Sequence, residues 1–369
     1  MGHFLTPAGN VLVTGATGMI GGEIVRRLDA NFGGRVWALV RPRDGIGGAD
    51  RLAARYGRSG GGIPGPSVSA IGGDVTAPDW GLDPIDLAHV IGGADAIIHC
   101  AADTSFAAHR DTGRTNVESV RRLIDIARRC ERRPLVVYVG TASNVGRAAH
   151  ACLTEADGCR PGNEHFNEYT HSKALAEEML RDSGLPALTV RPTIVLGAGL
   201  PDPDFAKQIL WCVPLTRCFG GLPIDPTARL DIVDVGFVAE ATLALACHPA
   251  RRFDCYHLSA GEAGAVTVGK LNVVVGRHYR RKRTLRLFAP AEWSRAQHRE
   301  YVRTPLQRRV FRALRHYLPF LNMDVVYDAA RLAADLGAAC PPVRPAADYL
   351  PELLRLIRQR AALREAALP

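Results

Sequence analysis

The order of apolar runs along the chain predicts an α/β protein built on a doubly wound parallel sheet. Short β-branched runs alternate with stretches of helical spacing up to about residue 196, and a glycine-rich turn joins the first strand to the first helix. The predicted strands cover residues 10–14, 35–40, 68–71, 96–99, 135–139 and 188–190. The clearest predicted helices cover residues 22–28, 116–129 and 168–181. Strands that alternate with helices at this spacing pair in parallel.

The alternation weakens after residue 196. We therefore expect residues 1–196 to form the sheet domain, with a further contribution from 228–260. Residues 197–227 and 261–369 are expected to form a smaller, mostly helical C-terminal region that covers the strand ends. Residues 43–65, rich in glycine and arginine, predict a long surface loop around a short helix at 51–56.

The composition of the 369 residues is that of a globular protein, with 47% apolar and 22% charged residues, which excludes a disordered chain. No apolar run approaches the roughly 18–20 residues that a membrane span needs, so no transmembrane segment is expected. The first residues lack a basic stretch followed by an apolar core, and we expect no signal peptide. Nine cysteines without CxxC pairs or histidine spacing speak against disulfides and zinc, and favour a cytoplasmic protein.

The turn TGATGMIG at residues 14–21 has the features of a dinucleotide-binding loop. Gly15 can make the tight turn, Gly18 lets the backbone approach a pyrophosphate, and Gly21 lets the helix pack on the strand. The N-terminus of the following helix supplies oriented N–H groups for the phosphates. A tight turn without a ligand is the alternative, but the strand before it and the helix after it favour a Rossmann fold.

The end of the second strand indicates which dinucleotide binds. A site for NAD carries an acid near this point for the ribose 2′-hydroxyl, whereas this chain has Arg41, with Arg43 and Arg51 nearby. An arginine can pair with a 2′-phosphate, which an acid would repel, so the expected cofactor is NADPH. Asp74 follows the third strand, where its carboxylate could hold the adenine amino group.

Tyr169 and Lys173 form a YxxxK pattern on the predicted helix 168–181, where a spacing of four residues puts both on one face. The ammonium is expected to lower the pKa of the phenol and to hold the nicotinamide ribose. The tyrosine would then donate a proton to a carbonyl that is being reduced. A surface Tyr–Lys pair without function is the alternative interpretation.

Hydroxyl residues follow the strand 135–139, at the end where open α/β sheets bind ligands. Thr141 can donate a hydrogen bond that stabilises negative charge on a substrate oxygen, and Ser143 is the competing hydroxyl. Asn116 opens a predicted helix, so it either caps that helix or contacts the cofactor.

These motifs, together with HCAA at 99–102 and Arg191-Pro192, resemble those of the extended short-chain dehydrogenase/reductases. Within that superfamily, several stretches look like the thioester reductases and fatty acyl-CoA reductases. They are LVRP at 39–42 with the following Arg51-Leu52, GDVTAPDWGLD at 73–83, IIHCAADTSF at 97–106, TNVESV at 115–120 and GAACPPV at 337–343. The similarity covers most of residues 10–260 and returns near 320–350. The chain departs from the family at residues 140–143, where Gly-Thr-Ala-Ser replaces the usual Ser-Thr-Ala-Tyr.

The resemblance implies that Thr141, Tyr169 and Lys173 are the catalytic set. The cofactor contacts that it implies are Thr14, Gly15, Thr17, Gly18, Met19, Ile20, Gly21, Arg41, Arg51, Asp74, Val75, Cys100, Ala101, Ala102, Asn116, Tyr169, Lys173, Arg191 and Pro192. The implied activity is NADPH-dependent reduction of an acyl thioester, bound to a carrier protein or to coenzyme A, to an aldehyde or further to the alcohol. The alternatives are a ketone/hydroxyl dehydrogenase and a nucleotide-sugar epimerase or dehydratase. A cofactor-binding protein without turnover is disfavoured by the intact Thr–Tyr–Lys set.

The net charge of +9 is concentrated in one stretch, residues 277–315, which we call the basic segment. Thirteen arginines and lysines against two acids give it +11, so the other residues together carry −2. The segment is either a solvated helix face or a dock for an acidic partner. That partner would be an acyl carrier protein near Arg308, Arg309 and Arg312, the phosphates of coenzyme A, or an anionic membrane surface. No nucleic-acid-binding motif accompanies the charge, so nucleic acid is not expected.

Overall fold

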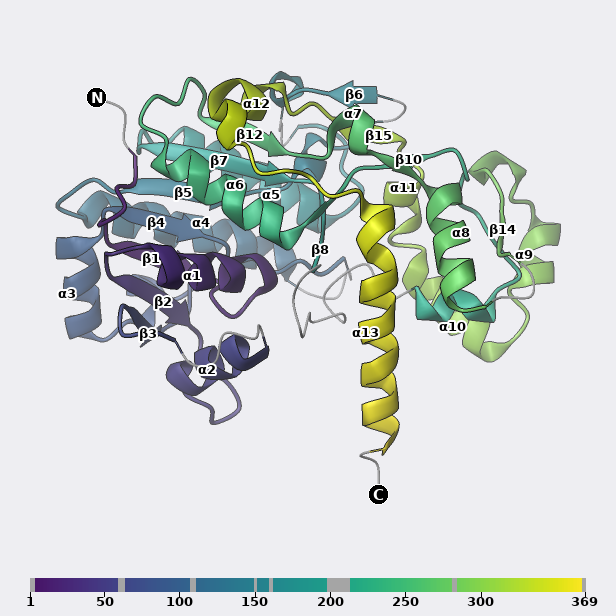
Figure 1. Cartoon of the computed structure of the whole chain (residues 1–369), viewed down its shortest axis with the longest axis horizontal. Coiled ribbons are helices and arrows are strands. Elements are labelled where there is room, and N and C mark those ends of the chain that lie inside the picture. Colours follow the sequence, from purple (N-terminus) through teal and green to yellow (C-terminus); the bar gives the residue numbers. More distant parts are fainter. Residues whose placement is uncertain are drawn as a thin grey trace.

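The computed structural model describes residues 4–58, 64–106, 111–148, 151–158, 162–197, 213–280 and 284–366. Its centre is a seven-stranded parallel sheet with the strand order β12-β7-β5-β4-β1-β2-β3 (Figure 1). The strands of this sheet are β1 (Val11–Thr14), β2 (Val36–Val40), β3 (Val68–Gly72), β4 (Ala96–His99), β5 (Leu135–Val139), β7 (Ala187–Pro192) and β12 (Cys255–Leu258). The predicted doubly wound α/β fold is thereby confirmed.

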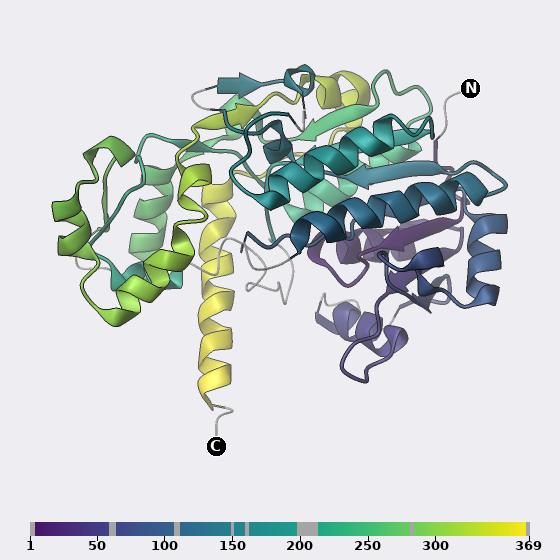
Figure 2. The same cartoon turned by 180° about the vertical axis from the view of Figure 1, so that it is seen from behind.

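Helices cover both faces of the sheet (Figures 1 and 2). One layer holds α1 (Met19–Asn31), α6 (Val235–Cys247) and α12 (Ala330–Leu336), and the opposite layer holds α3 (Pro84–Gly93), α4 (Thr112–Arg129) and α5 (Glu168–Arg181). Strand β1 shows how side chains divide between the layers, because Val11 and Val13 join one core cluster and Leu12 joins the other. Burial of both faces is the condition for an all-parallel sheet.

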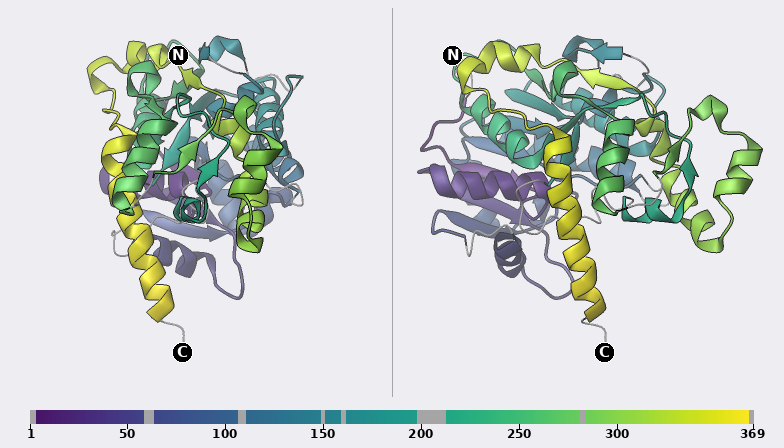
Figure 3. Two further views of the ribbon diagram at one scale, coloured as in Figure 1. Left: turned by 90° about the vertical axis from the view of Figure 1, so that its right-hand side faces the viewer. Right: turned by 45° about the vertical axis from the view of Figure 1, so that its right-hand side comes forward.

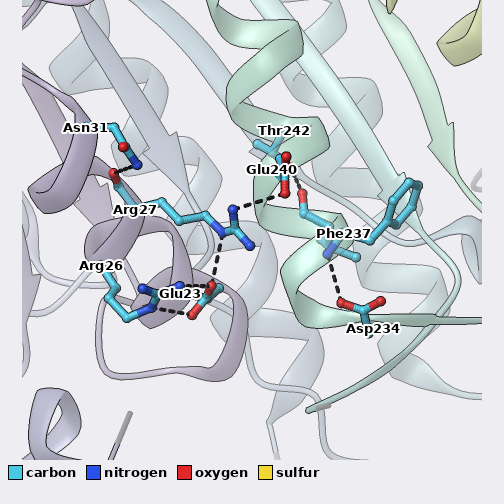
Figure 4. Close-up of polar contacts among 9 residues, drawn as sticks. Glu23, Arg26, Arg27, Asn31, Asp234, Phe237, Glu240 and Thr242 are labelled. Atoms are coloured by element: carbon cyan, nitrogen blue, oxygen red, sulfur yellow. Dashed lines mark hydrogen bonds and ion pairs between the residues drawn. The ribbon is translucent and has the colours of Figure 1, made fainter. Parts of the chain in front are cut away.

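Polar contacts fasten α6 to α1, the helix that follows the glycine-rich turn (Figure 4). Arg27 donates from Nη1 to Glu240 of α6 at 3.1 Å and from Nε to the buried Glu23 at 3.0 Å. Asp234 caps the start of α6 by accepting the N–H of Phe237 at 2.9 Å. The segment around residue 235 is therefore packed into the sheet layers.

Smaller sheets and short helices complete the chain. A four-stranded sheet has the order β13-β10-β15-β6, β8 pairs with β11, and β9 pairs with β14. These strands are β6 (Ala151–Leu153), β8 (Ile194–Leu196), β9 (Gly221–Leu222), β10 (Arg229–Leu230), β11 (Ile232–Asp234), β13 (Val266–Thr267), β14 (Arg286–Leu287) and β15 (Val325–Tyr327). The remaining α-helices are α2 (Gly48–Arg58), α7 (Gly261–Gly264), α8 (Val268–His278), α9 (Arg295–Tyr301), α10 (Pro305–Leu314), α11 (Leu318–Leu321) and α13 (Ala346–Ala366). The 3₁₀ helices are η1 (Pro78–Gly81), η2 (Ala142–Val145), η3 (Glu155–Asp157), η6 (Pro214–Cys218), η7 (Pro290–Glu292) and η8 (Gly337–Ala339).

Helices α8, α9 and α10 gather at one end of the molecule, and α13 projects away beside them (Figure 3). None of the helices in the described part of the chain has both the length and the apolarity that crossing a membrane requires.

Three expectations about the fold need correction. Helix α4 begins at Thr112, four residues before the predicted start at 116. Helix α2 extends beyond the predicted 51–56 at both ends, from Gly48 to Arg58. Its residues Leu52 and Tyr56 are buried in the core beside the sheet. Residues 261–369 do not all belong to the cap, since α12 packs against β12. The described C-terminal part is mostly helical, as expected, and it also supplies the short strands β13 and β15 to the four-stranded sheet.

Parts of three predicted segments lie outside the described residues. They are 59–63 of the surface loop, 198–212 of the cap segment 197–227, and 281–283 of the basic segment.

The parallel register brings the carboxyl ends of the strands to one edge of the sheet. Thr14 of β1 pairs with Leu39 of β2 and with His99 of β4, and Val139 of β5 pairs with Val190 of β7. Strand order runs through β2 and β3 on one side of β1 and through β4, β5 and β7 on the other. Open α/β sheets bind their ligands at such a switch point, outside the carboxyl ends of the strands.

Candidate active site

The glycine-rich turn lies where β1 meets α1, at the carboxyl edge. Gly15 has a φ of +68°, and a Cβ there would lie 2.7 Å from the backbone nitrogen of Ala101. A Cβ on Gly21 would lie 2.4 Å from the carbonyl oxygen of Gly15, so α1 packs this closely only without a side chain. Gly18 precedes α1 and has no capping side chain. The turn thus presents bare backbone at a helix N-terminus, which fits a nucleotide pyrophosphate.

His99, at the end of β4, connects this turn to α4. Its Nδ1 lies 2.9 Å from the hydroxyl oxygen of Thr14, which also accepts the N–H of Ala101 at 3.2 Å. Its Nε2 lies 3.4 Å from the hydroxyl of Ser119. Burial, reinforced by the nearby Lys173 ammonium, lowers the pKa of His99 to about 3, so the ring stays neutral. Thr14 and His99 therefore position Ala101 against the turn.

Arg41 and Asp74, predicted from two separate strands, lie side by side. Arg41 is largely exposed, and its Nη1 lies 3.4 Å from Oδ2 of Asp74. The other carboxylate oxygen of Asp74 accepts the backbone N–H and the hydroxyl of Thr76, at 3.0 and 2.8 Å. Burial pushes the pKa of Asp74 upward, but the hydrogen bonds from Thr76 and the proximity of Arg41 outweigh it and lower the pKa. The carboxylate of Asp74 is therefore ionised, and it is already bonded to Thr76 and Arg41.

The two neighbouring arginines behave differently. Arg51 of α2 donates from Nη1 to the backbone carbonyl oxygen of Arg41, so the two residues form one cluster at the end of β2. Arg43 instead forms an exposed ion pair with Asp44 at 3.2 Å.

Sequence reasoning missed Arg55, which lies one turn beyond Arg51 on α2. Arg55 is 4% exposed, and its Nε donates to the carbonyl oxygen of Gly18 at 3.2 Å. It thereby holds α2 on the glycine-rich turn. The sequence feature that could have identified Arg55 is its spacing, because it falls on the same helix face as the buried Leu52 and Tyr56.

Helix α5 covers residues 168–181, as predicted, and begins where Asn167 accepts the N–H of Thr170 at 3.0 Å. Tyr169, in its first turn, is partly exposed, and its phenol forms a side-chain hydrogen bond with Thr141. Burial outweighs this hydrogen bond and raises the pKa of the phenol to about 12. Tyr169 is therefore protonated at neutral pH and is held beside a second hydroxyl.

Lys173, the second residue of the YxxxK pattern, is buried. Its Nζ donates to the carbonyl oxygen of Val139, at the end of β5, at 2.8 Å and lies 4.3 Å from the ring centroid of Tyr138. The expectation that the ammonium lowers the phenol pKa is wrong in this structure, because burial dominates the pKa of Tyr169. A role of Lys173 in holding a ribose stays a prediction.

The two hydroxyls that follow β5 have different partners. Thr141 caps η2 by accepting the N–H of Ser143 at 3.3 Å and faces Tyr169. The hydroxyl of Ser143 is hydrogen bonded to the phenol of Tyr327, on β15. The geometry thus favours Thr141 as the partner of the proton donor. Tyr327 thus places an aromatic ring beside Ser143, the position at which the family usually has a tyrosine.

Asn116 does not cap a helix, because α4 begins one turn before it. Its Oδ1 accepts the N–H of Asp103 at 2.8 Å, and its Nδ2 donates to the carbonyl of Asp103 at 3.1 Å and to Ser172 at 3.0 Å. Ser172 lies on α5, next to Lys173. Asn116 therefore ties the segment after β4 to α5, and a direct cofactor contact stays a prediction.

Arg191 lies in a buried network beneath the site. Its Nε donates to Glu177 of α5 at 3.0 Å, and both residues are 4% exposed. Glu177 also accepts the side-chain N–H of Asn144, in η2, at 2.7 Å. These contacts direct the guanidinium of Arg191 toward α5, and its predicted cofactor contact stays a prediction.

The remaining predicted cofactor contacts lie in segments already described. Thr17, Met19 and Ile20 belong to the glycine-rich turn and the start of α1, Val75 follows Asp74, Cys100 and Ala102 follow β4, and Pro192 ends β7.

An aromatic wall, formed by Phe106, Tyr317 and Phe320, stands against Tyr169 and was not predicted. The ring of Phe106 lies 5.6 Å from that of Tyr169 and 4.9 Å from each of the other two rings. Phe320 belongs to α11, so this short helix is linked to Tyr169 through the ring of Phe106. The wall gives the site one apolar side.

A protonated phenol paired with a hydroxyl, beside a dinucleotide-type turn and a YxxxK lysine, defines an oxidoreductase of the extended short-chain dehydrogenase/reductase type that uses a nicotinamide cofactor. The Male sterility protein family matches residues 13–242, and the chain belongs to this family.

Comparison with individual proteins gives a consistent result. The chain is 29% identical over 245 residues to the polyketide synthase-nonribosomal peptide synthetase ffsA of Aspergillus flavipes, a match that covers 63% of this chain and 6% of that protein. Its fold is similar to the crystal structure of the terminal R domain from the myxalamid PKS-NRPS pathway, with a TM-score of 0.79 and 22% identity over 96% and 91% of the two chains. A thiolation-reductase di-domain from an archaeal non-ribosomal peptide synthetase follows, with a TM-score of 0.75 and 17% identity over 98% and 77%.

Proposed function

We propose that the chain reduces an acyl thioester, carried on an acidic carrier protein, to an aldehyde with NADPH. The observation that carries the proposal is the Thr141–Tyr169 hydroxyl pair at the carboxyl edge of the sheet. The named relatives are synthetases or their R domains, and one similar structure joins a reductase to a thiolation domain, which supports a carrier-bound substrate.

The proposed reaction requires two hydroxyl groups and a substrate-binding site from the protein. A bound nicotinamide supplies the hydride that reaches the thioester carbon. The Tyr169 phenol, with its pKa raised to about 12, can donate a proton to the substrate oxygen while Thr141 donates a second hydrogen bond. The hydroxyl proton of the resulting hemithioacetal returns to the Tyr169 phenolate as the carbonyl re-forms and the carbon–sulfur bond breaks. The thiolate then leaves, with an aldehyde as the other product.

Oxidation of NADPH on a panel of substrates tests this proposal. We expect turnover with acyl thioesters of a carrier protein, and none with simple ketones or nucleotide sugars. Turnover of ketones or nucleotide sugars in preference to thioesters would assign the chain to the dehydrogenases or epimerases of the same fold.

Preference for NADPH rests on the cluster of Arg41 and Arg51 at the end of β2. We expect Arg41→Asp to weaken NADPH binding and to shift the ratio of kcat/KM values toward NADH, because the change removes a phosphate partner and supplies a ribose acceptor. Arg43→Asp, at an arginine that already pairs with Asp44, is the matched control and should leave the ratio unchanged. An unchanged ratio in Arg41→Asp would show that another residue sets the preference.

The basic segment is proposed to dock the carrier protein. Arg308, Arg309 and Arg312 are exposed on α10, whose opposite face buries Val310 and Leu314. The charge on this helix therefore faces solvent, where it can steer an acidic partner.

Reversal of Arg308, Arg309 and Arg312 to glutamate tests this dock. We expect KM for a carrier-bound thioester to rise severalfold or more at low salt, and the difference to shrink at high salt because salt screens the charges. An uncharged N-acetylcysteamine thioester should be unaffected. Reversal of Arg35, Arg128 and Arg355, exposed residues elsewhere on the chain, controls for net charge. An equal response of both substrates, or of both variants, would contradict docking, and the basic segment would then be only a solvent-exposed helix face.

A further inference from the structure

The C-terminal part of the chain contains an apolar cavity of about 140 Å³. Among the described residues, seventeen line it, of which fifteen are aliphatic and none is charged. The two polar residues direct their donors to the backbone, since Asn272 donates to the carbonyl of Leu285 at 2.8 Å and Thr216 to that of Val213 at 2.7 Å. A cavity of this chemistry favours hydrocarbon over water.

Two chain segments place the cavity next to the catalytic residues. Strand β7, whose Val190 pairs with Val139 just before Thr141, leads into β8, and Ile194 of β8 lines the cavity. Helix α11 lies between the two regions, because Phe320 contributes to the aromatic wall while the adjacent Leu321 lines the cavity. An acyl group extending from a thioester at Tyr169 would therefore have an apolar space beyond α11.

Part of the described lining is accessible to solvent. Leu271, Leu287 and Leu321 line it and remain partly exposed. Its volume is close to the roughly 150 Å³ of an engineered apolar cavity that stays dry and binds benzene. We infer that this cavity is the acyl subsite, and that the thioester carries a compact hydrocarbon group of about the size of a six-carbon chain. The inference rests on the proposed thioester reduction and adds the substrate class.

Chain-length profiles of saturated acyl-N-acetylcysteamine thioesters, from acetyl to dodecanoyl, test the subsite. For the unchanged protein, kcat/KM should rise about fourfold for each added methylene, as expected for transfer of a methylene from water, and level off near hexanoyl. Leu271→Trp should remove most of this gain for hexanoyl and leave the acetyl ester within about twofold. Leu271→Ala should move the plateau to longer chains.

Val273→Trp is the matched control, because Val273 lies on the same helix but is 43% exposed and does not line the cavity. It should retain the unchanged profile. Identical profiles for the protein and both Leu271 variants would overturn the inference, and so would an equal shift in the control.

Hexanol, added without any cofactor or thioester, gives a readout that does not depend on activity. We expect it to raise the Tm of the unchanged protein and of Val273→Trp, and to have little effect on Leu271→Trp. If hexanol stabilises all three equally, the cavity is not the binding site. If thioesters are not reduced but the hexanol pattern holds, the proposed function fails while the apolar site stands.

Discussion

Tyr169→Phe should lower kcat for thioester reduction by about 10²-fold or more, because a positioned proton donor is worth at least that much. The phenol hydroxyl that this change removes is hydrogen bonded to Thr141 and has a pKa of about 12. The affinity for NADPH should stay within about twofold, since the proposed phosphate contacts lie at the glycine-rich turn and at Arg41. Stopped-flow measurement of a single turnover, with NADPH titrated separately, separates the two quantities.

A matched control is Tyr301→Phe, which also removes one buried phenol hydroxyl. That hydroxyl bonds to Arg286 in the C-terminal region, at 2.9 Å. We expect kcat to be nearly unchanged in this variant. Activity close to that of the unchanged protein in Tyr169→Phe would remove the tyrosine from the catalytic set and leave Thr141 as the principal donor.

Glu177→Ala should cost about 3–5 kcal/mol of stability, because it removes the carboxylate that pairs with the buried guanidinium of Arg191. The same change removes the acceptor of the Asn144 amide, which lies in η2 just after Thr141. We therefore expect the surviving folded protein to show a lower kcat as well. Urea denaturation measures the free energy of unfolding, and the shift in its midpoint reports the loss.

The neighbouring Glu178 provides the control, since it is exposed and lies 3.6 Å from Arg181 on the same helix. Exposed ion pairs contribute about 0–1 kcal/mol, so Glu178→Ala should change stability little. Replacement of both Glu177 and Arg191 by apolar residues of similar size should restore much of the lost stability, because no buried charge is then left alone. Equal costs for Glu177→Ala and Glu178→Ala would contradict the role given to the buried network.

The parts of the fold that were predicted correctly are those whose signal is local in the sequence. The strand 96–99 and the helix 168–181 have the predicted bounds, because short apolar runs and helical periodicity depend only on near neighbours. The turn at Gly15 was also predicted, since its strand, glycines and helix are consecutive. The start of α4 at Thr112 was missed because its first turn contains Gly113, a weak helix former.

The features that were missed depend on pairing between distant segments. Strand β15 pairs with β6 and β10 in a sheet assembled from four separate parts of the chain, and no local sequence pattern predicts this pairing. The aromatic wall brings Phe106 to Tyr317 and Phe320, more than two hundred residues away. The pKa of Tyr169 was predicted in the wrong direction because sequence spacing shows which charge is near but not how deeply the phenol is buried.

Transfer of deuterium from the nicotinamide to the product tests the central claim most directly. The protein is supplied with NADPH labelled at C4 and with an acyl thioester, and the product is trapped as an oxime for mass spectrometry while free thiol is titrated. The account predicts one deuterium at the aldehyde carbon and one thiol released for each NADPH oxidised. Oxidation of NADPH without thiol release, or thiol release without deuterium in the aldehyde, would contradict thioester reduction at this site.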